Sequence, residues 1–61
     1  MALVTYTLVA VDAVTGVQLS VHYPAVSPLM AQAWAELCFR NNAWSSAELR
    51  GPAGILWTAD K

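Results

Sequence analysis

Hydrophobic and polar residues alternate along the first part of the chain in the way that β-strands require. Residues 4–10 carry apolar or aromatic side chains at every second position, and residues 17–23 alternate more strictly. Successive side chains of a strand point to opposite faces, so a period of two predicts two strands here. Gly16 can take the left-handed conformation that closes a four-residue loop built on a type I turn. We therefore predict an antiparallel hairpin with Asp12 opposite Val17, which brings the apolar sets of both strands to one face.

A helix is predicted over residues 28–40, after the second strand. Pro24 is expected to end that strand because proline cannot donate to a hydrogen-bonded ladder. Ser27 offers an N-cap oxygen, and Pro28 suits the first helical position. The asparagines at 41–42 are expected to end the helix in the left-handed conformation. The apolar stripe predicted to face the sheet consists of side chains at helical spacing: Met30, Ala33, Trp34 and Leu37.

A second hairpin is predicted in residues 43–60, around the turn sequence Gly-Pro-Ala-Gly at 51–54. With Arg50 opposite Ile55, unbroken alternation sorts the side chains into two faces. One face receives Ala47, Leu49, Leu56 and Thr58. The other face receives Trp44, Glu48, Arg50, Ile55 and Trp57. The sequence therefore predicts one α+β domain, residues 1–61, of element order β-β-α-β-β, with the helix packed on one face of an antiparallel sheet.

Apolar side chains occur on both predicted faces of this second hairpin, while a single helix can cover only one face. If the helix covers Leu49 and Leu56, then Trp44 and Trp57 lie on the open face beside Ile55. The reverse register buries the two tryptophans and exposes the two leucines. Either arrangement leaves an apolar surface, and such surfaces usually mark contact sites.

Seven residues are the candidates for contact with a protein partner. Aromatic residues and arginine are enriched where binding energy concentrates, and Phe39 is predicted to project from the helix on the side opposite Met30. The set is Trp44, Trp57, Ile55, Glu48, Arg50, Phe39 and His22. An edge strand offers a second route, because it can pair with the same strand of another copy and continue the sheet across a two-fold axis.

Composition strengthens the expectation of a partner. The chain has 61 residues, of which 57% are hydrophobic and 11% are charged, against about 25% charged in typical globular domains. Domains this small often depend on disulfides, metals or self-association. Cys38 is the only cysteine and His22 the only histidine, so neither an internal disulfide nor a structural zinc site is expected. A homo-oligomer, with a dimer favoured, is therefore predicted.

Charge and chemistry argue against other classes of protein. A net charge of −1 gives no basic surface for phosphates, so no direct nucleic-acid partner is expected. Cys38 is placed on the flank of the helix stripe and His22 on the polar side of its strand, and nothing fixes Glu48 near Asp60. We therefore expect no enzyme activity and no cofactor. A small-molecule site would require a pocket between subunits, to which His22, Tyr23 or Glu48 would contribute.

The distribution of apolar residues also bears on location. No apolar run reaches the roughly 18 to 20 residues that span a bilayer, so no membrane partner is expected. The N-terminal residues have neither the basic region nor the cleavage site of a secretory signal. These features predict a cytoplasmic location.

The order hairpin, helix, hairpin, together with a Gly-x-Leu-Trp element at residues 54–57, resembles small phage-encoded proteins, including some anti-CRISPR proteins. The resemblance implies a protein that binds and blocks a host complex without chemistry. Some of those relatives use basic residues on the sheet, whereas this chain has three cations, so no functional residue is carried over. The leading hypothesis is a non-catalytic protein-binding module, in its specific form a phage or mobile-element inhibitor. The alternative is a structural or assembly subunit that forms an obligate homo-oligomer.

Overall fold

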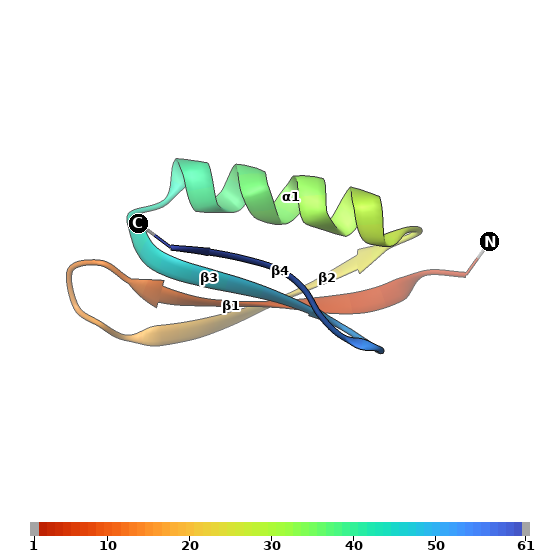
Figure 1. Cartoon of the computed structure of the whole chain (residues 1–61), viewed down its shortest axis with the longest axis horizontal. Coiled ribbons are helices and arrows are strands. Elements are labelled where there is room, and N and C mark those ends of the chain that lie inside the picture. Colours follow the sequence, from red (N-terminus) through yellow and green to blue (C-terminus); the bar gives the residue numbers. More distant parts are fainter. Residues whose placement is uncertain (1, 61) are drawn as a thin grey trace.

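A computed structural model describes residues 2–60 and contains one helix packed on one face of a four-stranded sheet (Figure 1). The elements are β1 (Val4–Asp12), β2 (Gln18–Ala25), α1 (Pro28–Asn41), β3 (Trp44–Gly51) and β4 (Gly54–Asp60). The strands lie in the order β2-β1-β3-β4, and every neighbouring pair is antiparallel. The predicted α+β fold is therefore confirmed, and β2 and β4 are the edges of the sheet.

The first hairpin has the predicted register. The Asp12 N–H donates to the Val17 carbonyl over 2.9 Å, and Gly16 has a φ of 74° in the connecting loop. The Asp12 carboxylate accepts hydrogen bonds from the backbone N–H groups of Val14, at 2.8 Å, and Thr15, at 2.9 Å. These bonds lower the pKa of the Asp12 carboxyl, that from Thr15 having the largest effect. The turn is thus held by the side chain that opens it.

Strand β2 continues through Pro24, so the prediction that this proline ends the strand is wrong. Pro24 pairs with Thr5, and the strand ends at Ala25. Proline is tolerated on an edge strand where its nitrogen faces away from the neighbouring strand, because no ladder hydrogen bond is then lost.

The start of the helix is as predicted, and its end is not. The Ser27 hydroxyl accepts a hydrogen bond from the Met30 N–H over 3.2 Å, and Pro28 follows as the first helical residue. At the C-terminal end, Asn42 is extended, with a φ of −123°, instead of left-handed. Its side-chain amide donates to the Cys38 carbonyl over 2.8 Å and so satisfies one of the free carbonyls at that end.

The buried stripe of α1 is rotated from the predicted one. Ala31 and Ala35 are fully buried against the sheet, whereas Met30 and Leu37 are about half exposed, at 47% and 53%. Trp34 is half-buried at the margin between the two stripes. Alanines at the contact let the helix backbone approach the sheet closely, and the larger side chains then lie outside the contact.

Trp44 is buried because of a β-bulge between β1 and β3. Val11 lies opposite Ser46, but Asp12 lies opposite Trp44, so Ser45 is an extra residue. An extra residue reverses the alternation of side chains beyond it. Trp44 therefore turns to the helix side of the sheet, where it is only 7% exposed, and its predicted place on the open face is wrong.

A second bulge has the same effect on Trp57. Arg50 lies opposite Ile55, as predicted, but Leu49 lies opposite Trp57, so Leu56 is the extra residue in β4. Trp57 therefore shares the helix side of the sheet with the fully buried Leu49, and it is half-buried there. Neither of the two predicted arrangements holds, because both assumed unbroken alternation.

The core of the described residues is small. Five of its nine buried apolar residues are alanines, and only four are large: Tyr6, Leu8, Trp44 and Leu49. Ten large hydrophobic side chains are exposed: Leu3, Val14, Val17, Val21, Val26, Leu29, Met30, Leu37, Ile55 and Leu56. More large apolar side chains therefore face solvent than fill the interior.

Replacing Leu8 by alanine should be far more costly than replacing Leu29. Leu8 is fully buried, so Leu8→Ala should lower the free energy of unfolding by about 2 to 5 kcal/mol or leave the chain unfolded. Leu29 is 78% exposed, so Leu29→Ala, the same chemical change, should cost no more than about 0.5 kcal/mol. Urea unfolding followed by circular dichroism measures both. Equal losses would contradict this description of the core.

The stability that Asp12 contributes should depend on pH. Its pKa is lower in the folded chain than its ordinary value of 3.8, so its contribution is complete above that value. The contribution is lost as the pH falls through the lower, folded pKa. Unfolding midpoints of the wild type and Asp12→Asn should therefore differ most at neutral pH and converge in acid. A difference that stays constant over this range would show that the carboxylate charge is not responsible.

Candidate binding surfaces

The sheet divides the seven predicted contact residues into two groups. Three lie on the helix side and belong to the core or its margin: Trp44, Trp57 and Phe39. Four belong to the opposite, open face or its rim: His22, Glu48, Arg50 and Ile55. Ile55 is 61% exposed, as expected, but Trp44 and Trp57 face the other side of the sheet. The predicted single aromatic contact surface is therefore not formed.

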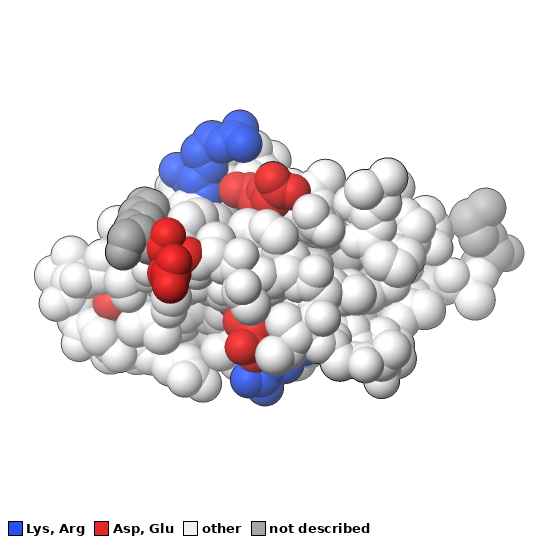
Figure 2. All heavy atoms as spheres, viewed as in Figure 1, with Lys and Arg blue, Asp and Glu red and all other residues white. Residues whose placement is uncertain are grey.

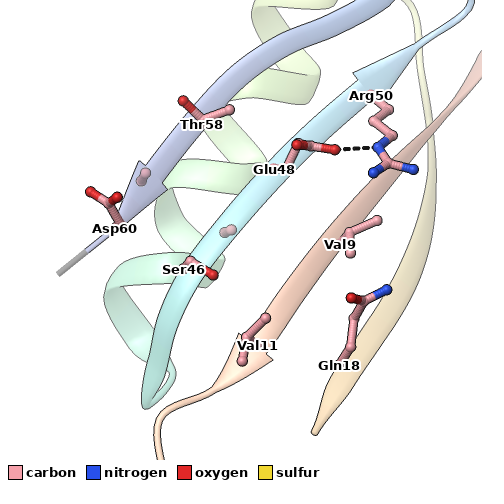
Figure 3. Close-up of a pocket in the computed structure, with 10 residues that line it drawn as sticks. Val9, Val11, Gln18, Ser46, Glu48, Arg50, Thr58 and Asp60 are labelled. Carbon is pink, nitrogen blue, oxygen red and sulfur yellow. Dashed lines mark hydrogen bonds and ion pairs between the residues drawn. The ribbon is translucent and has the colours of Figure 1, made fainter. Parts of the chain in front are cut away.

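The open face has a shallow hollow of about 310 Å³ between β1, β3 and β4 (Figure 3). Val9 and Val11 line one side of it, and the carboxylate of Glu48 pairs with the guanidinium of Arg50 at another. Asp60 projects from β4 at its far end (Figure 3). Exposed ion pairs of this kind contribute little to stability. The open face is mostly polar, and its charges partly neutralise one another.

The imidazole and the thiol considered for catalysis are kept apart, whereas Glu48 and Asp60 line the same hollow of the open face. His22 Nδ1 lies 3.1 Å from Thr7 Oγ1 on the open face, whereas Cys38 lies on the helix, on the other side of the sheet. Burial raises the pKa of the Cys38 thiol, which disfavours the reactive thiolate. Within residues 2–60, no cluster of three or more histidine, cysteine or acidic side chains could hold a metal ion.

Two aromatic pairs connect the helix to the edges of the sheet. Tyr23 of β2 stacks on Trp34, with ring centroids 4.3 Å apart and planes at 7°. Trp57 of β4 meets Phe39 edge to face, with centroids 6.1 Å apart and planes at 80°. Such pairs stabilise by about 0.5 to 1.5 kcal/mol beyond the area that they bury. These aromatic side chains therefore hold both flanks of α1 on the sheet.

An apolar surface that the sequence reasoning missed lies along the β2 flank of the helix. We call it the β2-side surface, and it consists of exposed and half-buried apolar side chains of β2, its preceding loop and α1: Val17, Leu19, Val21, Tyr23, Met30, Trp34 and Leu37. The stack of Tyr23 on Trp34 joins the part on the strand to the part on the helix. Residues 13–35 contain no lysine, arginine, aspartate or glutamate, and this charge-free segment was the signal in the sequence.

The opposite flank of the helix has a different character. A hollow there is lined by Glu36, Phe39, Arg40 and Trp57, so it combines both signs of charge with aromatic surface. Figure 2 shows charged groups spread over the visible face in small, separate groups, with wide uncharged areas between them. Glu36 and Arg40 also line a further hollow with Ala33 and Leu37, so they lie between this flank and the β2-side surface.

Comparisons with protein-family models, with curated proteins and with solved structures found no match. Among residues 2–60, no helix has the length and apolar character that a membrane span requires. The resemblance to phage-encoded proteins and the absence of enzyme activity remain predictions.

Cys38 should react slowly in the folded chain. Because its pKa is raised by burial and its side chain is only partly accessible, little thiolate should be presented to a reagent. Alkylation with iodoacetamide at mildly alkaline pH, followed by mass spectrometry, should be slower for the folded chain than for the same chain in urea. Equal rates would indicate that the thiol is freely exposed.

Proposed function

We propose that this protein is a binding module that occupies the surface of a protein partner and performs no chemistry. The observation that carries the proposal is the β2-side surface, where apolar side chains of a strand and a helix adjoin without a formal charge. Apolar patches of a few hundred Å² on small domains usually mark interaction sites. The contact residues are therefore those of this surface, in place of the aromatic cluster expected from the sequence.

The small core supports the same proposal. Exposing ten large apolar side chains while burying four leaves much of the hydrophobic stabilisation of this chain unused. The open face is a weaker candidate, because its hollow is shallow and contains the Glu48–Arg50 pair and Asp60. A partner at the open face would have to desolvate these charges, whereas the side chains that form the β2-side surface are uncharged, although Leu37 lines a hollow with Glu36 and Arg40.

The specific form of the proposal is an inhibitor of a host complex, encoded by a phage or mobile element. Its support is the resemblance in element order and in the residues at 54–57. Steric occlusion needs only a complementary surface, so the separation of Cys38 from His22 is compatible with it.

Charge placed on the β2-side surface should abolish binding. Leu37→Glu puts a carboxylate at a half-exposed position of that surface, where burial against a partner would require its desolvation. The immobilised wild type should retain at least about ten times as much partner protein as the immobilised variant. A loss of 1.4 kcal/mol in binding free energy is enough for that factor. Quantitative mass spectrometry of the retained proteins measures this.

Thr58→Glu is the matched control, because Thr58 is an exposed residue on the open face. It introduces the same charge and should leave retention unchanged. Circular dichroism establishes that both variants are folded. Equal retention by Leu37→Glu and Thr58→Glu, or a monomeric chain that retains nothing, would contradict the proposed function.

A further inference from the structure

We propose that the occupant of the β2-side surface is a second copy of this chain, paired through β2 about a two-fold axis at Ser20. This inference rests on the proposed function, since it names the partner of that surface. Three features support it: the free backbone groups of β2, the side chains of β2, and the difference between the two edges of the sheet.

The hydrogen-bonding pattern of the first hairpin fixes which backbone groups of β2 are free. The Asp12 N–H bonds to the Val17 carbonyl, and Ala10 pairs with Leu19 in the same register. In antiparallel strands, residues alternate between bonding inward and pointing outward. The backbone groups of Gln18, Ser20 and His22 therefore point to the free edge, together with the carbonyl of Pro24.

A two-fold axis at Ser20 gives a counterpart to both the N–H and the carbonyl of all three residues. With the axis at Ser20, this residue pairs with itself, Gln18 pairs with His22 of the second copy, and His22 pairs with Gln18. An axis at His22 would place Pro24 opposite Ser20, where proline has no N–H to donate. An axis at Gln18 would place Ser20 opposite Gly16 of the connecting loop. An axis at Val21 would place Gln18 opposite Pro24, which has no N–H for the Gln18 carbonyl, and an axis at Leu19 would place His22 opposite Gly16 of the connecting loop. The axis at Ser20 avoids all of these losses.

The side chains agree with this register. On the helix side, Leu19 of each copy comes opposite Val21 of the other, and both belong to the apolar surface. On the open face, Gln18 comes opposite His22, and both are polar groups that can share a hydrogen bond. Because residues 13–35 carry no charge, the two-fold brings no like charges together.

The two edges of the sheet are built differently. Exposed edges are usually protected by charges, bulges or proline. Strand β4 has a bulge at Leu56 and ends in Asp60, whereas β2 has a regular register and no charge. Its one proline, Pro24, lies outside the stretch that would pair. Strand β2 is therefore the unprotected edge.

Strand pairing alone would be a small interface, and the helix flank supplies the rest. Stable dimers bury at least about 600 Å² on each partner, roughly a seventh of the 3944 Å² surface of the described chain. Met30 and Leu37, at about half exposure each, lie one helical turn before and after Trp34, which stacks on Tyr23 of β2. The paired sheet would bring these flanks of the two helices toward each other.

The first test is the mass in solution. Light scattering over a dilution series should give twice the 6.6 kDa of one chain. Ser20→Pro removes an N–H that points to the free edge. Pro24 of the same strand already lacks such an N–H, so the fold should persist. The substitution deletes two bonds between copies and should raise the dissociation constant of the dimer at least about tenfold. Ser20→Ala, the control, should dimerise like the wild type.

The second test fixes the register. Across the two-fold, the two copies of residue 20 have Cα atoms about 5.5 Å apart, within the range of a disulfide. Ser20→Cys should therefore form a covalent dimer on mild oxidation. Gln18→Cys, equally exposed on the same face, should not, because its counterpart is several residues away. Cys38 is common to both variants.

The outcomes separate this inference from the proposed function. A monomer at all concentrations, a dimer unaffected by Ser20→Pro, or equal cross-linking of the two cysteine variants would overturn the pairing through β2. If such a monomer still retains another protein and loses it in Leu37→Glu, the β2-side surface binds a different partner, and the proposed function stands.

Discussion

A single helix of 14 residues has to cover one face of a four-stranded sheet, and the other features of this protein follow from that constraint. Close contact is made by alanines, with Ala31 and Ala35 of the helix fully buried. The aromatic pairs Tyr23–Trp34 and Phe39–Trp57 then extend the contact to both edge strands. The result is a thin core with large aromatic groups at its margins and exposed aliphatic side chains beyond them.

The parts of the fold that could be predicted are those where two independent signals agree. In the first hairpin, the alternation of both strands and the loop ending at Gly16 specify one register, which the structure has. At the helix start, Ser27 and Pro28 likewise act together. The prediction of the buried helix face was wrong because apolar residues at a spacing of 3.6 residues form two overlapping stripes here. Choosing between them depends on how closely the helix approaches the sheet, and a single sequence does not contain that distance.

The tryptophans were misplaced for a different reason. A β-bulge adds one residue without changing the composition of a strand, so alternation read from the sequence continues through it on the wrong face. Two such bulges, at Ser45 and Leu56, turned both tryptophans of the second hairpin inward. The binding site predicted at the largest aromatic residues therefore fell on side chains that belong to the core or its margin. The charge-free segment 13–35 was visible in the sequence. It points to a contact surface only because β2 is an edge strand, which the sequence did not show.

The positions of the charged residues bear on both the small core and the edge strand β2. All seven charged residues of the chain lie at Asp12 or beyond residue 35, although residues 13–35 include an edge strand and an exposed helix flank. On a permanently solvated edge, a lysine or glutamate would cost nothing and would prevent unwanted pairing. In a surface that becomes buried, the same residue would have to be desolvated without a partner. The absence of charge from this segment is therefore what the proposed pairing through β2 requires, because that pairing would cover the edge strand and the adjoining flank of the helix.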